Sequence, residues 1–403
     1  MFRRMYYNMR GDTPVKGLCR GMSPFDAFDA KTTGKGGMYV QFKFLMPTKV
    51  YFGKDSIAQN GEELSKFGSK AYIVTGGRSA QASGALSDIC SALEHFNISY
   101  DVFDKVENNP STDTVKIGGI EARQNGADFV IGIGGGSPLD AAKAIAVLAA
   151  NDIEPEQLFT NIFPNKPLPV IAIPTTAGTG SEVTPYSVLT RNELQTKGSF
   201  GTQDTFPVIA FLDPRYTESQ PLNVTVNTAI DALSHNMEGY LGNRRTPISD
   251  LLAQEGIRLF GACIDSLRKG SFDWEDRKNL LYISMLGGIV ISHTGTTIIH
   301  GAGYNYTYFR DIPHGQANGW LMAEYLRFNY EYAKDRIENI LRLMSLESID
   351  AFDAVIASLI GRAPKLEEAE ISRYAAITMT QRSTAANIRP LQCTDMEEFL
   401  RNI

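Results

Sequence analysis

The chain has 403 residues, 43% of them hydrophobic and 21% charged, so it can bury more than one core. A net charge of -6 without basic blocks, and the lack of an apolar run near the ~20 residues that cross a bilayer, argue against nucleic-acid and membrane partners. Its four cysteines lie far apart with no CxxC pair, which excludes a thiolate zinc cluster and suits reduced thiols in a cytoplasmic protein.

Residues 1–45 are predicted to be an N-terminal extension that is disordered in part. The first 37 residues carry seven basic and three acidic residues, and they lack the apolar region of a secretory signal. Three arginines near the start leave a transit peptide open, although the segment has no amphipathic period. We favour a disordered tail, or a start codon assigned too early with Met38 or Met46 as the true initiator.

From about residue 46 the chain alternates strand-like and helix-like stretches. Helix-compatible segments such as STDTVKIGGIEARQNG (111–126) and SPLDAAKAIAVLAA (137–150) separate short apolar runs that end in Gly, Pro or polar residues. The runs predicted as strands are 70–77, 98–106, 127–136 and 168–176. This alternation predicts an α/β domain over residues 46–215, with βαβ units and a Rossmann-like parallel sheet covered by helices.

Beyond FLDPRYTESQP (211–221) the strand signals fade and helical periods dominate. The helical segments are NTAIDALSHNMEGYLG, SDLLAQEGIRLFGACIDSL, ENILRLMSLE and EISRYAAITMTQRS. We therefore predict that an all-helical domain over residues 216–403 follows the α/β domain.

The stretch FVIGIGGGSPLDAAKAIA (129–146) is predicted to hold a phosphate. An apolar strand leads into Gly134–Gly136, with Ser137 as the N-cap, Pro138 at the first helical position and Asp140 three residues after the cap. Glycines let the backbone approach a phosphate closely, and a helix start offers free N–H groups. The alternative is an ordinary tight turn, and these glycines follow the third predicted strand, so the standard dinucleotide fingerprint does not match.

The loop that follows the next predicted strand also supports a bound nucleotide. The loop in IAIPTTAGTGSEVT (171–184) supplies small hydroxyl donors, namely Thr175, Thr176, Thr179, Ser181 and Thr184. Because the ends of parallel strands meet at one edge of a sheet, two such loops predict a nucleotide with several phosphates.

The strand end IVTGGRSA (73–80) bears on the ribose of that nucleotide. It offers Gly76, Gly77, Arg78 and Ser79. An acidic residue here would favour a free 2′-hydroxyl, and its absence beside Arg78 and Ser79 favours a 2′-phosphate. The alternative is that Arg78 is a solvated loop residue.

Asp231 and His235 stand four apart in a helical pattern, so they share one face of a helix. The simplest interpretation is an amphipathic helix with a solvated side. Its apolar face would carry Ile230, Leu233, Met237 and Leu241, and its solvated side Asp231, His235 and Glu238.

Two later histidines favour a metal site instead. His300 follows the apolar segment LGGIVISHTGTTII and should be buried, and a buried imidazole needs a partner. His314 lies in the loop sequence IPHG. One carboxylate and three imidazoles fill most of the coordination shell of a divalent metal, and Fe(II) or Zn(II) suit this set.

These motifs together resemble the iron-containing (group III) alcohol dehydrogenases, whose superfamily also holds glycerol dehydrogenase and dehydroquinate synthase. The likeness covers roughly residues 46–403 and rests on GGGSPLDAAK, PTTAGTGSEVT, DALSHNMEGYL and His300 followed by PHGQAN. It implies that family's two-domain fold with the metal in the cleft between the domains. The implied metal ligands are Asp231, His235, His300 and His314, and the implied nucleotide residues are Gly135, Gly136, Ser137, Thr175, Thr176 and Lys197.

One position departs from the family pattern. Many members carry a further histidine four residues after the third metal ligand, often assigned to proton relay, and Tyr304 stands there in this chain. A tyrosine, with a reference pKa near ~10, is a poorer relay at neutral pH. His293, seven residues before His300, would lie on the same side of a continuous helix and becomes a candidate for the relay. A pocket-wall or capping role for His293 is the alternative.

The resemblance implies reversible hydride transfer between NAD(P)(H) and a small primary alcohol or aldehyde, with Fe(II), or Zn(II), as the metal and NADP(H) favoured over NAD(H). A homo-oligomer, namely a dimer, is expected. Three alternatives stay open: a glycerol-type polyol dehydrogenase, another superfamily member such as a lyase, and a nucleotide-binding sensor without catalytic activity.

Overall fold

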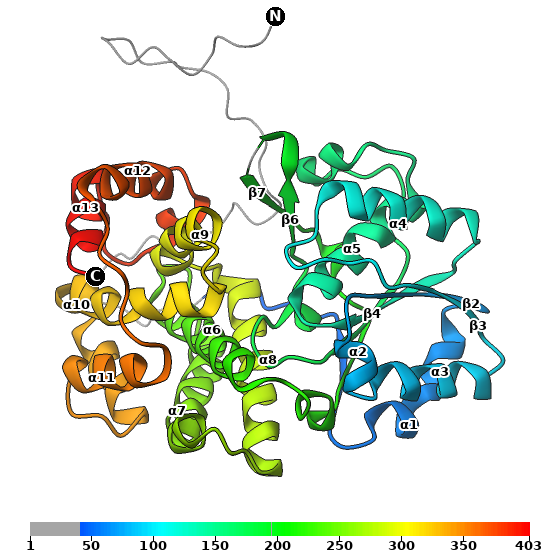
Figure 1. The fold of residues 1–403 in the computed structure, drawn as a ribbon, viewed down its shortest axis with the longest axis horizontal. Coiled ribbons are helices and arrows are strands. Elements are labelled where there is room, and N and C mark those ends of the chain that lie inside the picture. The colour runs from blue at the N-terminus through cyan, green and yellow to red at the C-terminus, as the bar shows by residue number, and fades with distance from the viewer. Residues whose placement is uncertain (1–40, 195) are drawn as a thin grey trace, which may run out of the picture. The chain divides into compact units, whose positions relative to one another are not determined.

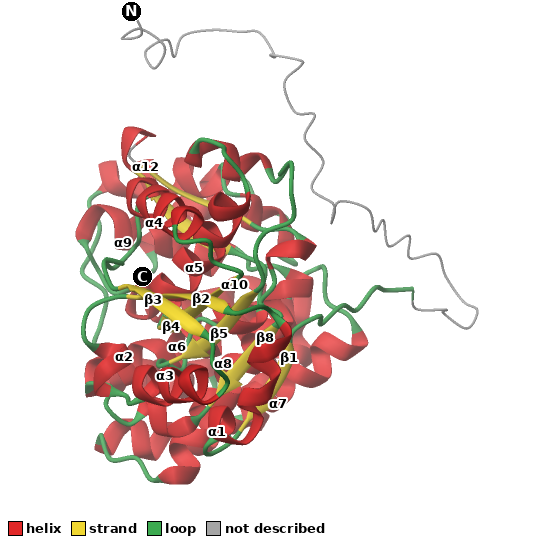
Figure 2. Cartoon of the chain, turned by 90° about the vertical axis from the view of Figure 1, so that its right-hand side faces the viewer, coloured by secondary structure: helices red, strands yellow, loops and turns green. Residues whose placement is uncertain are grey.

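Six parallel strands form the central sheet of this computed structural model, which describes residues 41–194 and 196–403 (Figures 1 and 2). The strands lie in the order β1-β8-β5-β4-β2-β3. Their bounds are β1 Lys49–Phe52, β2 Lys70–Thr75, β3 Ser99–Phe103, β4 Phe129–Gly134, β5 Val170–Pro174 and β8 Ile209–Leu212. The four predicted strands and their parallel pairing are confirmed, whereas β1 and β8 were not predicted. Residues 1–40 of the predicted extension lie outside the described residues.

Helices cover both faces of the sheet. Alternate residues of β2 point to opposite faces: Ile73 packs in a cluster with Ile89 of α3 (Ala85–His95), and Val74 packs in another with Ile145 of α5 (Gly136–Ala150). The first face also carries α1 (Ser56–Asn60) and α2 (Ser79–Ala82), and the second α4 (Thr112–Gln124). The inner strands β2, β4, β5 and β8 are therefore buried on two sides, as expected for apolar runs in a parallel sheet, whereas the edge strands β1 and β3 are partly exposed.

An antiparallel hairpin follows the second predicted loop. It consists of β6 (Ser187–Arg191) and β7 (Thr196–Phe200). Leu189 and Phe200 are buried and join the cluster that contains α5, so the hairpin packs against that helix. This hairpin was not predicted.

Helices alone follow from Leu222 onward in the described chain, and this confirms the predicted helical region. They are α6 Leu222–Leu241, α7 Pro247–Lys269, α8 Trp274–Thr294, α9 Ile298–Arg310, α10 His314–Leu343, α11 Ile349–Ile360, α12 Glu368–Met379 and α13 Cys393–Arg401. Helix α6 lies between α7, α8 and α10, and for that reason its polar residues Asp231, His235 and Glu238 are buried. The alternative of a solvated side for this helix is therefore excluded. The domain boundary near residue 215 stays a prediction.

A sharp break separates α8 from α9. Helix α8 ends at Thr294, Gly295 has a φ of 68°, and α9 begins at Ile298. The two helix axes differ in direction by 111°. The break brings the first residues of α9 against α6, and with them His300.

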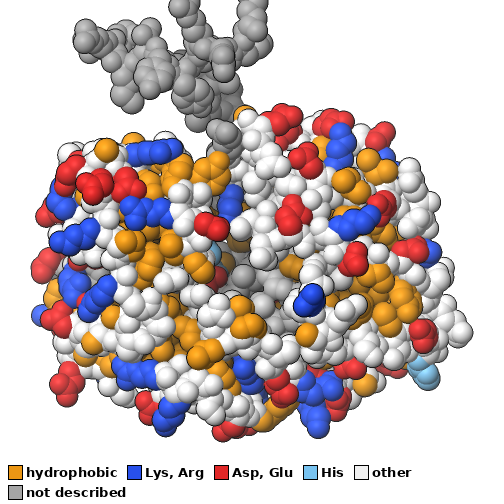
Figure 3. Space-filling view, viewed as in Figure 1, with side chains coloured by type: hydrophobic (Ala, Val, Ile, Leu, Met, Phe, Trp, Pro, Cys, Tyr) orange, Lys and Arg blue, Asp and Glu red, His pale blue; other side chains and the backbone are white. Residues whose placement is uncertain are grey.

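No single helix of the described chain is long and apolar enough to span a membrane, and only α8 and α9 taken together reach that length and composition. On the face shown in Figure 3, basic and acidic side chains are interspersed.

Candidate active site

Three strand ends line one cavity of about 520 Å³ at the carboxyl edge of the sheet. The predicted loops after β2, β4 and β5 all contribute to it, together with the segment after β3 and one residue of α6. The lining residues are Gly76, Gly77, Arg78, Ser79, Val106, Glu107, Asn108, Gly135, Gly136, Ser137, Pro138, Thr176, Thr179 and Thr228. The structure therefore brings together nine of the residues predicted to bind the nucleotide.

Glycine is required where these loops touch. A Cβ atom on Gly136 would lie 2.9 Å from Thr179 Cγ2, and one on Gly76 would lie 2.1 Å from the carbonyl oxygen of Val106. The absence of side chains lets the loops close on one another and leaves the backbone exposed to the cavity.

Helix α5 begins two residues earlier than predicted. Gly135, not Ser137, is the N-cap, and Ser137 lies in the first turn, where its Oγ accepts a hydrogen bond from the N–H of Asn109 at 3.1 Å. A glycine cap supplies no side-chain acceptor, so the first N–H groups of the helix remain available to an anion in the cavity.

Asp140, which was predicted to bind the nucleotide, is not among the residues that line the cavity. Its carboxylate accepts hydrogen bonds from Ser181 Oγ at 2.6 Å and from the N–H of Val188 at 2.9 Å. The buried Lys143 Nζ lies 3.7 Å from it and donates to Ser181 Oγ and to the Tyr186 carbonyl, both at 2.7 Å. Burial lowers the pKa of Lys143 to about 8. This network fastens α5 to the second loop and to the hairpin.

Four other predicted residues also lie outside the cavity lining: Gly134, Thr175, Thr184 and Lys197. Thr175 and Thr184 are buried. Lys197, on β7, donates from Nζ to Asn109 Oδ1 at 2.8 Å, and burial lowers its pKa.

Glu107, which was not predicted, lines the cavity just after β3. An acidic residue after the second strand of a βαβ unit is a known signal for a ribose contact, so the pattern could have been noticed. However, its Oε1 accepts hydrogen bonds from the N–H of Ser111 and from Thr114 Oγ1, both at 2.8 Å. Its carboxylate therefore stabilises the N-terminal end of α4 by accepting these hydrogen bonds. Burial alone would raise the pKa of Glu107. The hydrogen bonds to its carboxylate outweigh this effect, so the pKa lies below its usual value.

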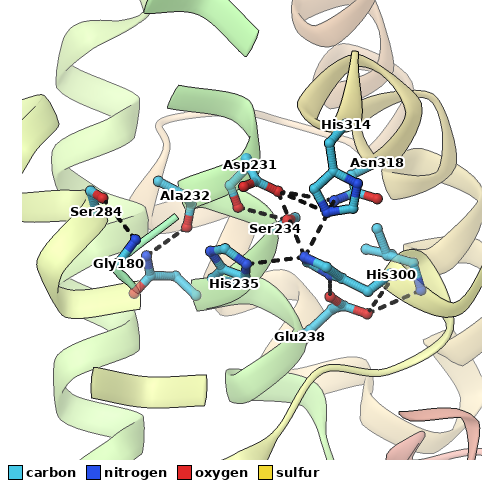
Figure 4. A network of polar contacts seen from close by, with 12 residues as sticks. Gly180, Asp231, Ala232, Ser234, His235, Glu238, Ser284, His300, His314 and Asn318 are labelled. Carbon is cyan, nitrogen blue, oxygen red and sulfur yellow. Dashed lines mark hydrogen bonds and ion pairs between the residues drawn. The ribbon is translucent and has the colours of Figure 1, made fainter. Parts of the chain in front are cut away.

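Three histidines and one aspartate converge from three helices (Figure 4). Asp231 and His235 come from α6, His300 from α9 and His314 from α10. The Nε2 atoms of His300 and His314 lie 3.6 and 3.7 Å from Asp231 Oδ1, and these three groups can offer ligand atoms within 4.8 Å of one another. The Nε2 atom of His235 lies 3.0 Å from that of His300.

The electrostatics of the cluster suit a cation. Burial would raise the pKa of Asp231, but the histidines outweigh it and lower that pKa. Burial lowers the pKa of His235, and it lowers that of His314 to about 3. Burial alone would also lower the pKa of His300. The neighbouring carboxylates of Glu238 and Asp231 outweigh it and raise that pKa to about 10.

This donor set fits a divalent metal. Imidazole lone pairs that face one another at such short distances need a proton or a cation between them, and one hard carboxylate beside three imidazoles suits Fe(II) or Zn(II). Asn318, four residues after His314 on α10, was not predicted. Its Nδ2 lies 3.0 Å from Asp231 Oδ1 and 3.1 Å from His314 Nε2, so it adjoins the same centre.

His293 does not lie beside His300 on a continuous helix, and that prediction is wrong because of the break after Thr294. Its Nε2 accepts a hydrogen bond from the N–H of Leu45 at 3.0 Å, and its Nδ1 lies 2.8 Å from the carbonyl oxygen of Ile289. Its ring stacks on Phe44 with centroids 4.3 Å apart. Both ring nitrogens are thus engaged by the backbone, which fits the capping alternative.

Tyr304 does lie at the cluster. Its ring stacks on His314, with centroids 5.2 Å apart and planes 15° apart, and meets His300 edge-on at 6.4 Å. Burial raises the pKa of Tyr304, so its hydroxyl keeps its proton at neutral pH.

A nucleotide-type cavity in an α/β fold, next to a buried histidine and aspartate cluster in a helical bundle, defines a metal-containing oxidoreductase that uses NAD(P). Residues 47–214 match the family model for iron-containing alcohol dehydrogenase, and residues 225–403 match that for the C-terminal part of the same family. The chain belongs to the iron-containing alcohol dehydrogenase family.

Characterised relatives agree with this assignment. The chain is 30% identical to a 1,3-propanediol dehydrogenase of Klebsiella pneumoniae, over 80% of this chain and 85% of that protein. It is also 30% identical to an NADPH-dependent butanol dehydrogenase of Clostridium saccharobutylicum, over 81% of this chain and 84% of that protein. The crystal structure of an iron-containing alcohol dehydrogenase from Thermotoga maritima is similar with a TM-score of 0.83 and 36% identity, covering 90% of this chain and 99% of that one.

Proposed function

We propose that this oxidoreductase transfers hydride reversibly between NADP(H) and a small primary alcohol or aldehyde, at a ferrous or zinc ion held by Asp231, His235, His300 and His314. The observation that carries the proposal is the convergence of three Nε2 atoms and one carboxylate next to the nucleotide-type cavity. Thr228, three residues before Asp231 on α6, lines that cavity and connects the two sites. The propanediol and butanol activities named for the relatives support a small alcohol as the substrate.

The residues of the chain prepare the site for this chemistry. When bound, the metal supplies Lewis-acid polarisation of the substrate oxygen, and the nicotinamide exchanges the hydride. The loops with Gly136 and Thr179 would hold the phosphates of the nucleotide and so fix its position in the cavity, which is a positioning effect. Tyr304, packed flat on His314, restrains that ring and keeps water away from one side of the centre.

The preference for NADP(H) over NAD(H) is supported by the charge around the cavity. Arg78 and Ser79 line it and can bind a 2′-phosphate. Within the lining, the one acidic side chain is Glu107, and its Oε1 is already engaged by Ser111 and Thr114. A homodimer and a cytoplasmic location remain proposals, based on the family resemblance and on the scattered cysteines.

The test is an absorbance assay on protein reconstituted with Fe(II) or with Zn(II) in the absence of air. NADPH and NADH are each combined with short aldehydes, and the oxidised cofactors with diols and glycerol. We expect NADPH oxidation with an aldehyde in the wild type. His300→Ala and Asp231→Ala should abolish turnover while NADPH fluorescence titration shows unchanged cofactor binding.

Four outcomes would contradict the proposal. Full activity of His300→Ala after metal removal would exclude the metal centre. Turnover with glycerol alone would indicate a polyol dehydrogenase. Cofactor binding without any turnover would indicate a sensor, and turnover without net change in reduced cofactor would indicate a lyase.

A further inference from the structure

Glu238 is the most enclosed carboxylate at the cluster, and its role is not explained by metal ligation. It lies on α6, three residues after His235, and its side chain is 0% exposed. A buried carboxylate is unfavourable unless hydrogen bonds compensate for the lost water. The surroundings of its two oxygens therefore indicate its function.

One oxygen of Glu238 accepts hydrogen bonds from the start of α9. The donors to Oε1 are the N–H and the Oγ1 of Thr297, at 2.8 and 2.7 Å, and the N–H groups of Ile299 and His300, at 3.0 and 3.3 Å. The first N–H groups of a helix have no partner within the helix. Within the described chain, the N-cap Thr297 makes no side-chain capping bond of its own. Glu238 thus caps α9 from a neighbouring helix, with its negative charge at the favourable end.

The other oxygen of Glu238 contacts the Nδ1 atom of His300. A carboxylate can only accept, so Nδ1 carries the proton and the lone pair of the neutral ring is on Nε2. That Nε2 is the atom directed at Asp231 and His235. The Nδ1 atoms of His235 and His314, by contrast, have no hydrogen-bonding partner in the described chain.

We propose that Glu238 is a positioning residue that selects the metal-binding tautomer of His300 and, through the same carboxylate, fixes the helix start on which His300 lies. This inference rests on the proposed metal site. Removing a carboxylate that hydrogen-bonds a ligating histidine typically weakens metal binding about 10–100-fold.

Glu238→Gln separates the two parts of this role. The four donors around Oε1 require an acceptor, so the glutamine oxygen must take that place and the cap survives. The amide NH₂ then faces Nδ1 of His300 and can only donate, which moves the ring proton to Nε2 and blocks the metal-binding lone pair. Thr297→Val is the matched control, because it removes one donor to the cap and leaves the contact between Glu238 and His300 intact.

The experiment measures Zn(II) affinity of the full-length protein by competition with a chromophoric chelator, and thermal unfolding of the metal-free protein. We expect Glu238→Gln to bind Zn(II) about 10–100-fold more weakly with a Tm close to that of the wild type. Thr297→Val should show a lower Tm and an affinity within about twofold of the wild type.

The possible outcomes distinguish failure of the role proposed for Glu238 from failure of the proposed metal site. If the wild type itself binds no Zn(II), the proposed metal site fails. If the wild type binds and Glu238→Gln binds equally well, Glu238 is only a cap and the inference is overturned. Should Glu238→Gln not fold, ¹⁵N NMR of the zinc-loaded wild type decides, since a proton on Nε2 of His300 would refute the assigned tautomer.

Discussion

Gly180→Ala should destabilise the protein more than its backbone conformation alone explains. Gly180 lies in the second loop with a φ of 61°, in the left-handed region. A Cβ atom there would stand 2.4 Å from the Cα of Gly288 and 2.9 Å from the carbonyl oxygen of Ser284, both on α8. These are backbone atoms of a buried helix, so they cannot move aside as a flexible side chain would.

The expected magnitude has two parts. An alanine in the left-handed region costs about 1 kcal/mol relative to glycine. Inserting a methyl group into a close-packed contact adds about 1–3 kcal/mol. We therefore expect Gly180→Ala to lower the free energy of unfolding by about 2–4 kcal/mol.

Gly126→Ala is the control for the conformational part. Gly126 has a φ of 68°, and a Cβ atom there meets nothing within 4 Å, so its replacement should cost only about 1 kcal/mol. Urea unfolding followed by circular dichroism gives the free energy for both variants and the wild type. Because the loop of Gly180 carries Thr179 in the cavity lining, NADPH affinity measured by fluorescence should fall in Gly180→Ala alone.

Equal destabilisation of the two variants would refute this reasoning, because it would mean that the second loop does not press on α8 as closely as the structure shows. Unchanged NADPH affinity in Gly180→Ala, despite a clear loss of stability, would show that the loop can shift without disturbing the cavity.

Three further predictions concern the cofactor, a histidine and the metal. Arg78→Ala should raise the KM for NADPH about 5–30-fold and leave that for NADH nearly unchanged, since an exposed charged hydrogen bond contributes about 1–2 kcal/mol. Burial lowers the pKa of His293, so its contribution to stability is complete above pH about 6.5 and is lost as the pH falls through the folded value. His293→Gln should therefore show a flatter Tm against pH in mildly acidic buffers, with zinc affinity unchanged. Chelation should lower the Tm of the wild type but not that of His300→Ala, corresponding to about 2.7 kcal/mol when free metal was at 100 Kd.

The parts of the structure that were predicted from sequence are those whose signals lie within a short contiguous segment of the chain. The strand-to-helix turn at Gly134–Gly136 combines an apolar run, glycines and a helix start within a few positions, and its place in the fold follows from parallel pairing. The spacing of Asp231 and His235 likewise puts both on one helical face.

The missed features depend on contacts between distant segments. Strand β1 is only four residues long, so its own sequence contains too little periodicity to predict it. The burial of Glu238 follows from the helices around α6, which no pattern within α6 reveals. The helix break after Thr294 had a local signal in Gly295, but the apolar character on both sides outweighed it in a periodicity argument.

The pairing of β1 with β8 has a consequence for synthesis on the ribosome. Lys49 pairs with Ile209, so β1 emerges about 160 residues before its partner strand exists. At about 5–20 residues per second, the edge of β1 waits for roughly 8–30 s with its backbone groups unpaired. During that interval the nascent chain presents an open strand that other nascent chains can join, and its protection then depends on chaperones rather than on the fold.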